Sequence, residues 1–353
     1  MKTITIGMDL GDKKHQVCVL DAEGKKLEEC EVMNTVNGVR KFLTRYVGAT
    51  VMMETGTHSP WVSREVEASG CHAVVGNARK LRAIYQSPNK SDERDAEMLG
   101  RIGRCDRKLL SPVRHRGLEA QVDLEWIKAR DKLVEVRTKL INHVRSVVKG
   151  TGHRLGSCSA ESFGKRARRE MPGILKEGLE GMLESIETLS EKIRDYQKRI
   201  EDLGAKRYPE TLKLRQVPGV GAITSLAYVL TLEEPGRFER SRAVGAWLGL
   251  TPRRDQSGET DRALRISKAG NEYLRRLLVS CAQYLMGPFG PDCHLRRWAM
   301  KIAVSGGRNA KRRAVVALAR KLAVVLHRLW VSGEDYQPFY PTGGESKEMA
   351  TAA

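Results

Sequence analysis

The chain has 353 residues, enough for two or three domains with sizeable hydrophobic cores. Its 62 Lys and Arg residues outnumber its 43 Asp and Glu residues, and the formal charge of +19 favours a polyanionic partner such as nucleic acid. No apolar run approaches the roughly 18 residues needed to span a bilayer, and the charged start is not typical of a signal peptide. We therefore expect a cytoplasmic protein without a membrane partner. The seven cysteines form no Cys-x-x-Cys pair, so neither a zinc ribbon nor a disulfide framework is indicated.

Residues 1–110 have the pattern of an α/β domain. The expected elements, taken from alternation, helical periodicity and turn residues, are strands within residues 3–32, a helix over 34–46, a strand from Thr50 that ends on Glu54, a helix after 57–60, a strand over 73–75 and a helix that begins near Lys90. This order, three strands followed by strands that alternate with helices, resembles the RNase H-like fold.

Residues 111–205 are expected to form long helices. After a basic connector over 106–116, one helix is predicted over 118–149, and the Gly-, Ser- and Arg-rich stretch 150–178 is expected to be a loop or an insert. Residues 179–203 carry apolar side chains at heptad spacing, which is typical of a coiled coil between chains. The same spacing suits a hairpin with the preceding long helix inside one chain, and both alternatives stay open.

Residues 206–340 are expected to be mostly helical and strongly basic, followed by a disordered tail over 341–353. A Pro-Gly-Val-Gly turn resembles a helix-hairpin-helix, in which Gly219 and Gly221 let backbone amides approach a phosphate; an ordinary turn between helices is the alternative. Between residues 291 and 330, ten Lys or Arg residues accompany one acidic residue, which favours phosphate contact. The candidate contacts in that stretch are Arg308, Lys311, Arg312 and Arg313.

Four carboxylates suggest metal-assisted cleavage of a phosphodiester. Asp9 and Glu54 each end a predicted strand, and adjacent strands would bring both side chains to one edge of a sheet. Asp92 and Asp95 are three residues apart, so they share one face of a helix that can pack on that sheet. Clustered carboxylates can hold one or two Mg²⁺ or Mn²⁺ ions. A purely structural role, in place of metal binding, is the strongest alternative for Asp92, since Asp is a common helix N-cap.

These segments also carry a family resemblance. The matching stretches, which occur in order over most of the chain except about 150–178 and the last dozen residues, are IGMDLGDKKHQVCVLD, METGTHSPW, NKSDERDAEML, VPGVGAITSLAYVLTLEEPGRFERSRAVGAWLGLTPRRDQSG, RISKAGNEYLRRLL and GGRNAKRRAVVALARKLAVVLHRLW. Together they resemble the DEDD transposases of the IS110 family, which are related to the Piv and MooV invertases. The resemblance implies an N-terminal RuvC-like domain that holds the four acids and a C-terminal transposase domain with a nucleophilic serine.

The position that matches the nucleophile is Ser257, in the RRDQSGE turn. Its hydroxyl would attack a DNA phosphate and form a transient phosphoserine link, which conserves bond energy for strand exchange. The alternatives are that Ser257 belongs to an ordinary Ser-Gly turn, or that Ser267 takes the role; Ser267 stands where a helix N-cap is natural. Neighbouring cations that could hold phosphate charge are Arg253, Arg254, Arg262, Arg265 and Lys268.

The resemblance further implies donor and target double-stranded DNA and a structured guide RNA encoded by the element. Guided pairing would leave the protein needing basic grooves rather than base-reading side chains. Since recombination holds two duplexes at once, we expect a homo-oligomer, a dimer or a tetramer. Three rivals stay open: a plain RuvC-like metal-dependent nuclease, a Piv-like DNA invertase without a guide RNA, and an inactive nucleic-acid-binding protein.

Overall fold

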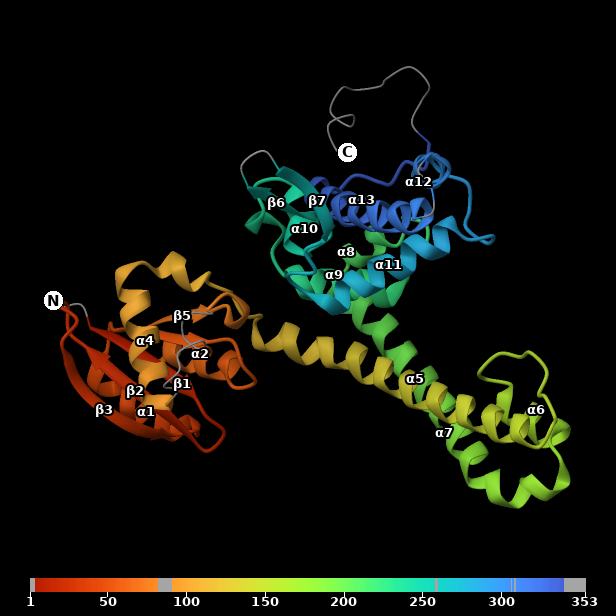
Figure 1. Cartoon of the computed structure of the whole chain (residues 1–353), viewed down its shortest axis with the longest axis horizontal. Coiled ribbons are helices and arrows are strands. Elements are labelled where there is room, and N and C mark those ends of the chain that lie inside the picture. Colours follow the sequence, from red (N-terminus) through yellow and green to blue (C-terminus); the bar gives the residue numbers. More distant parts are fainter. Residues whose placement is uncertain (1–3, 82–90, 258–259, 306, 308, 340–353) are drawn as a thin grey trace. The chain divides into compact units, whose positions relative to one another are not determined.

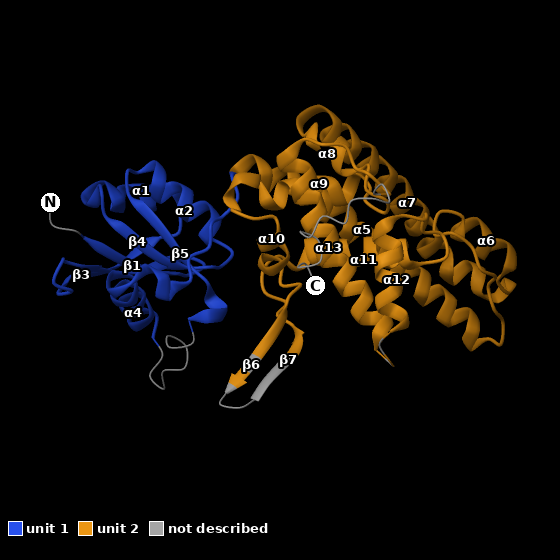
Figure 2. Cartoon of the chain, turned by 90° about the horizontal axis from the view of Figure 1, so that it is seen from above, with its two compact units in different colours: residues 1–117 blue, residues 118–353 orange. Residues whose placement is uncertain are grey.

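The computed structural model describes residues 4–81, 91–257, 260–305, 307 and 309–339. The chain divides into two compact units, Met1–Gly117 and Leu118–Ala353, which are coloured separately in Figure 2. The expected tail over 341–353 and Arg308 both lie outside the described residues. Throughout the described ranges, no helix is long and apolar enough to cross a membrane.

Unit 1 contains a mixed five-stranded sheet with the order β3-β2-β1-β4-β5. The strands are β1 (Thr5–Leu10), β2 (Lys14–Leu20), β3 (Lys26–Met33), β4 (Thr50–Glu54) and β5 (His72–Gly76). β2 runs antiparallel to both β1 and β3, whereas β1, β4 and β5 run parallel. The predicted α/β domain of RNase H-like type is confirmed.

Alternation along β1 assigns its residues to two faces of the sheet. Ile6 and Met8 are fully buried with residues of α1 (Val36–Leu43) and α2 (Ser59–Ala68). The opposite face carries α4 (Asp92–Cys105), and Figure 2 shows α4 on the other side of the sheet from α1 and α2. The short 3-10 turns of unit 1 are η1 (Thr44–Tyr46), η2 (Ala78–Lys80) and η3 (Arg107–Leu110).

The end of unit 1 is bonded to the edge of the sheet. The backbone N–H of Asn77 donates to the Leu110 carbonyl at 2.9 Å, and the N–H of Val113 donates to the Val75 carbonyl at 2.8 Å. These bonds satisfy backbone groups beside β5 that an uncovered edge strand would leave to water. The basic connector predicted over 106–116 is therefore an integral part of this unit.

Unit 2 begins with two long helices, α5 (Leu118–Gly150) and α7 (Gly173–Arg207), which pack against each other (Figure 1). Between them lies α6 (Phe163–Glu170), so the expected loop or insert over 150–178 is wrong for its second half. The apolar residues Phe163, Ala167 and Met171 recur every fourth position and are buried against the two long helices. Abundant Arg and Ser hid this short stripe from a composition-based prediction.

The heptad stretch forms the hairpin alternative, inside one chain. Its first row is buried as expected and consists of Leu179, Ile186, Ile193 and Ile200. The second buried row includes Leu183 and Ser190, whereas Met182 and Leu189, which also follow the heptad spacing, are only half-buried. A buried cation also lies between the two helices. The Arg137 guanidinium donates to Ser190 Oγ and to Glu161 Oε1, both at 3.0 Å.

The remaining elements of unit 2 are α8 (Glu210–Leu214), α9 (Ala222–Leu232), η4 (Pro235–Arg237), α10 (Arg242–Trp247), β6 (Pro252–Ser257), β7 (Thr260–Ile266), α11 (Glu272–Met286), α12 (His294–Val304) and α13 (Ala310–Ser332). Their core surrounds α9, where the fully buried Tyr228 donates a hydrogen bond to the Ala323 carbonyl at 2.7 Å. Leu124 and Ile127 of α5 and Ile200 of α7 belong to the same core. The long helices and the C-terminal elements are thus one compact unit, without the separation that we expected near residue 205.

Candidate functional site

The predicted strand-end acids lie next to each other on neighbouring strands. In the parallel pair β1–β4, Met8 is opposite Met53, so Asp9 and Glu54 occupy the next positions along the two strands. Adjacent strands are about 4.8 Å apart. Asp9 shares a face with Gly7 and Glu54 shares a face with Met52, and both faces are covered by α4. Both acids are half-buried.

The start of α4 carries the other two acids. Ser91 is the N-cap, and its Oγ accepts a hydrogen bond from the Arg94 N–H at 3.4 Å. Asp92 is the first helical residue, exposed, and Asp95 is half-buried one turn later. The N-cap role that competed for Asp92 therefore belongs to Ser91. Acidic side chains in a first turn also stabilise the helix through its dipole.

Gly7 determines how closely α4 approaches the sheet. A Cβ built on Gly7 would lie 1.8 Å from the Ala96 carbonyl oxygen and 2.6 Å from the Gly100 nitrogen, so only glycine permits this seating. Farther along the helix, Arg101 and Arg104 donate to the carbonyls of Gly24 and Ala22, at the opposite end of the sheet. α4 hence runs antiparallel to β1, and its start faces the strand end with Asp9. We call this set of Asp9, Glu54, Asp92 and Asp95 the acidic edge.

The donor chemistry of the acidic edge suits a divalent metal, because carboxylate oxygens are the ligands that Mg²⁺ and Mn²⁺ prefer. In the side-chain positions of the described residues, however, no three His, Cys, Asp or Glu side chains are grouped closely enough to hold a metal ion. The backbone thus brings the four acids to one edge, and metal binding by them stays a prediction.

Two histidines lie beside this edge, on the α1 and α2 face. His58 Nε2 is 3.5 Å from Asp12 Oδ1, and the His15 and His58 ring centroids are 6.5 Å apart. His15 is fully buried, and within the described residues neither of its ring nitrogens has a hydrogen-bond partner. Burial, assisted by His58, lowers the pKa of His15 to about 4, so His15 is neutral at pH 7.

A third histidine, which the sequence did not single out, supports the turn after Glu54. The Nε2 of His115 is 2.8 Å from Ser59 Oγ. That hydroxyl also bonds both the N–H and the carbonyl of Gly56, at 3.0 and 2.9 Å. Burial and the nearby Arg64 and Arg116 lower the pKa of His115. The connector thereby fixes the loop that leaves β4 at the acidic edge. A lone His in a basic connector gave no signal of this pairing.

The proposed nucleophile lies in unit 2, on the β6–β7 hairpin. Ser257 is the last residue of β6, and its backbone pairs with Thr260 of β7. Figure 2 shows the hairpin extending away from the helices of its unit. The competing Ser267 accepts a hydrogen bond at Oγ from the Ala269 N–H at 3.4 Å. It does not cap α11 as expected, because Asn271 does so, with its Oδ1 accepting from the Leu274 N–H at 2.8 Å.

The two glycines of the Pro-Gly-Val-Gly turn differ in their surroundings. Gly219 has φ +83°, and a Cβ there would lie 3.1 Å from the Cys281 carbonyl oxygen. Its backbone therefore approaches α11, which explains the glycine without a phosphate. Gly221 precedes α9, is exposed, and has open space around its Cα. Of this pair, Gly221 is the one whose amide could meet a ligand.

Some of the predicted phosphate-binding cations line a cavity, and others do not. Among those outside it are Arg253 and Arg254, which are exposed on β6. Arg262 lies on β7. Lys311, also outside the cavity, is exposed at the start of α13. The other predicted cations line a cavity of about 1310 Å³ within unit 2, and these are Arg265, Lys268, Arg312 and Arg313.

Comparison with known proteins finds a family model in each half of the chain. A model of DEDD transposases, described as "Transposase", matches residues 6–153, and a model described as "Transposase IS116/IS110/IS902 family" matches residues 212–295. The two units thus define a DEDD transposase, an enzyme of DNA phosphoryl transfer. The chain belongs to the IS110/IS116/IS902 family of transposases.

Several curated relatives match over nearly the whole chain. The transposase for insertion sequence element IS1111A of Coxiella burnetii is 28% identical and covers 96% of this chain and 92% of its own length. A putative transposase, y4pF/y4sB, of Sinorhizobium fredii is 28% identical over 95% of this chain and 86% of its own. A probable family 20 transposase of Pseudomonas aeruginosa is 27% identical over 96% of this chain and 100% of its own.

Proposed function

We propose that this transposase cuts and rejoins DNA with a composite site, formed by the acidic edge of unit 1 and Ser257 of unit 2. The observation that carries the proposal is the seating of α4 on Gly7. It aims the helix start with Asp92 and Asp95 at the strand end with Asp9, next to Glu54. That acids from three separate elements lie toward the same end of the sheet supports a site for phosphoryl transfer.

A divalent cation bound there would offset charge on a DNA phosphate and stabilise the attacking and leaving oxygens. The chain supplies the oxygen donors, from elements held in place by the sheet and by the Gly7 contact. Asp92 is exposed, which leaves the edge accessible to a phosphate backbone. The Ser59–His115 pair fixes the turn that follows Glu54.

Ser257 would provide the nucleophile. Its Oγ–phosphorus bond would form as one phosphorus–oxygen bond of the DNA backbone breaks, and the leaving sugar oxygen would take up a proton. The phosphoserine keeps the bond energy, so a second strand can be joined without an external energy source. Arg253 and Arg254, exposed on the same strand, would hold the negative phosphate near the hairpin end.

We further propose that a structured RNA encoded by the element guides the choice of DNA and that the active form is an oligomer. The charge of +19 supports a polyanionic partner. An oligomer would hold two duplexes at once. Since α5 and α7 bury the heptad rows against each other, the contact between chains would use another surface of the protein.

The test is recombination in cells between a donor plasmid that carries the element and a target plasmid. Asp9→Asn and Ser257→Ala are each expected to lower recombination by at least about 100-fold, because each removes a group that acts on the phosphate. Asp12→Asn, at an exposed position near the same edge, and Ser267→Ala are the matched controls and should leave recombination unchanged.

The rivals predict other results. DNA cleavage that survives Ser257→Ala but not Asp9→Asn would establish a plain metal-dependent nuclease and overturn the serine mechanism. Unchanged recombination in Asp9→Asn would overturn the metal site. Full recombination from purified protein without RNA would favour an invertase-like enzyme without a guide.

A further inference from the structure

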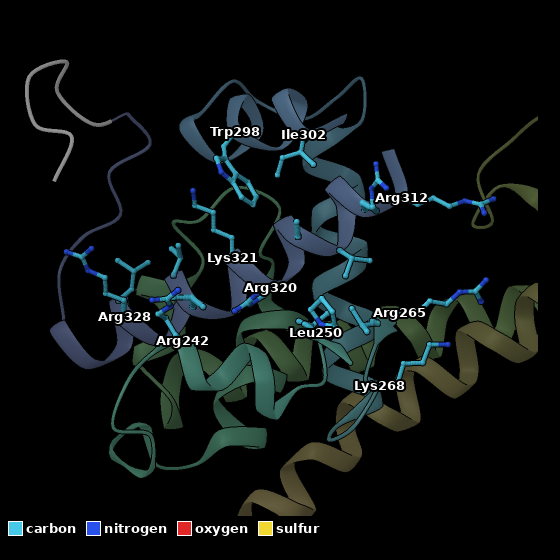
Figure 3. A pocket seen from close by; sticks show the side chains of 18 of the residues that line it. Arg242, Leu250, Arg265, Lys268, Trp298, Ile302, Arg312, Arg320, Lys321 and Arg328 are labelled. Atoms are coloured by element: carbon cyan, nitrogen blue, oxygen red, sulfur yellow. The ribbon is translucent and has the colours of Figure 1, made fainter. Parts of the chain in front are cut away.

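A cavity within unit 2 is lined by many cationic side chains. It measures about 1310 Å³ and is bounded by α12, α13, the end of β7 and the segment after α13. The cations that line it, some of which are labelled in Figure 3, are Arg242, Arg265, Lys268, Arg312, Arg313, Arg320, Lys321 and Arg328. We call this cavity the basic groove.

Of the described residues that line the basic groove, two are acidic, and both are engaged. Glu334 is 3.8 Å from Arg328. Asp335 is 3.3 Å from Lys213 and accepts a hydrogen bond from Gln216 at 3.0 Å. The groove therefore keeps a large positive excess, which complements a chain of phosphates.

The basic groove also has apolar lining residues. Among these are Leu250, Ile266, Ile302, Val316 and Val325. Trp298 projects from α12 toward Lys321 of α13, whose ammonium lies 4.2 Å from the centre of the indole (Figure 3). The indole is half-buried, so part of its surface remains accessible.

Cations beside apolar and aromatic side chains are the composition of a single-strand binding surface. Cations contact the phosphates, while unpaired bases lie on apolar and aromatic side chains. A duplex does not suit such a lining, because its bases are stacked and paired inside the helix. We propose that the basic groove binds a single strand of DNA, with its phosphates on the arginines and at least one base against Trp298.

The choice of DNA depends on the proposed function, through Ser257. Pro252, Leu264 and Ile266 line the groove at the base of the hairpin whose far end is Ser257. A strand of six residues rises about 17–20 Å. The strand to be joined to Ser257 is DNA, and once unpaired by cutting it could follow the hairpin into the groove.

The length of the groove sets the size of the strand. Its lining on α13 runs from Arg312 to Leu329. At about 1.5 Å per residue this face is roughly 25 Å long, which corresponds to about four to eight nucleotides.

The experiment measures fluorescence anisotropy of a labelled 12-nucleotide poly-dT with the full-length protein, in EDTA so that no cleavage occurs. Arg312→Ala is expected to weaken binding and to reduce the salt dependence, log Kobs against log salt, by about 0.7, the release expected per single-strand phosphate. Trp298→Leu keeps an apolar side chain and is expected to weaken binding about 5-fold or more. Arg194→Ala, exposed on α7 outside the groove, is the matched control and should bind as the unmodified protein does.

An oligonucleotide that lacks bases but keeps its phosphates separates the contribution of base stacking to affinity from the contribution of charge. The unmodified protein should bind it more weakly than poly-dT, and Trp298→Leu should bind both equally. Thermal melting of each variant separates lost binding from lost folding. Trp298 lies on α12 and Arg312 lies on α13. The test therefore stays decisive if one of these two variants unfolds.

Three outcomes would overturn the inference: equal affinity of all groove variants for poly-dT, tighter groove-dependent binding of a matched duplex, or tighter groove-dependent binding of poly-U RNA. None of these outcomes bears on Ser257 itself, because binding is measured without cleavage. Conversely, groove-dependent binding of poly-dT with recombination intact in Ser257→Ala would support the groove and reject the composite site.

Discussion

The acidic edge and the basic groove place their functional groups in opposite ways. At the edge, a backbone contact with no spare room, that of Gly7 with Ala96, holds the helix that carries two of the acids against the strand that ends on Asp9. At the groove, cations project from one face of α13 and its neighbours around an open cavity. The edge should therefore fail as a unit when one part changes, whereas the groove should lose affinity one cation at a time.

The largest effect is expected at the edge itself. Asp9→Asn should weaken Mn²⁺ binding by at least about 100-fold, since changes of groups that only orient metal ligands already cost about 10–100-fold. Calorimetric titration of the full-length protein with Mn²⁺ measures this directly. Asp12→Asn should bind as the unmodified protein does. Equal affinity of both variants for Mn²⁺ would show that Asp9 does not bind the metal.

Gly7→Ala tests whether backbone packing positions the edge. The new methyl group would collide with the Ala96 carbonyl, so α4 must shift, and overpacking of this kind costs about 1–3 kcal/mol of stability. Recombination should fall even at temperatures where the variant is folded, because Asp92 and Asp95 move with the helix.

Gly56→Ala is the matched control for that experiment, since a Cβ there meets nothing within 4 Å. Denaturant unfolding followed by circular dichroism gives the stability of each variant. A Gly7→Ala protein as stable and active as the Gly56→Ala protein would show that the close seating of α4 is unimportant.

A smaller effect is expected from His15 as the pH falls. Folded His15 has a pKa of about 4, below the 6.5 of the unfolded chain. Folding therefore favours the neutral form. The contribution of His15 to the free energy of unfolding is present above about pH 6.5 and is lost as the pH falls toward 4. His15→Phe should reduce the loss of unfolding free energy between pH 7 and pH 4.5 by about 2 kcal/mol.

Urea unfolding of the full chain at the two pH values measures this difference, and contributions from other groups cancel between proteins. His72→Phe, at an exposed position of β5, is the control and should leave the pH dependence unchanged. An identical pH dependence in the His15→Phe protein would contradict the buried, neutral state of His15.

Much of unit 1 could be predicted because its signals are local. The strand ends at Asp9 and Glu54 follow from alternation, and the start of α4 follows from Ser91 and the acids after it. The pairing of Ser59 with His115 could not be predicted, since it joins residues 56 positions apart through a non-periodic connector. The same holds for Gly7, whose role appears only once α4 is seated on it.

Unit 2 was less predictable because its patterns allow more than one partner. Heptad spacing over 179–203 suits a second chain as well as α5, and only the packing of the two helices distinguishes them. The basic residues of α13 predicted nucleic-acid contact, whereas the groove requires Trp298 from α12 and Ile266 from β7. Such convergence of distant segments leaves no periodic signal in the sequence.

The composite site is tested most directly by mass spectrometry of protein trapped on DNA during cleavage. We expect a nucleotide phosphate on the peptide that contains Ser257, formed with Mg²⁺ or Mn²⁺ in the unmodified protein and absent from both Ser257→Ala and Asp9→Asn. DNA cleavage without any covalent adduct, or an adduct on another residue, would contradict it.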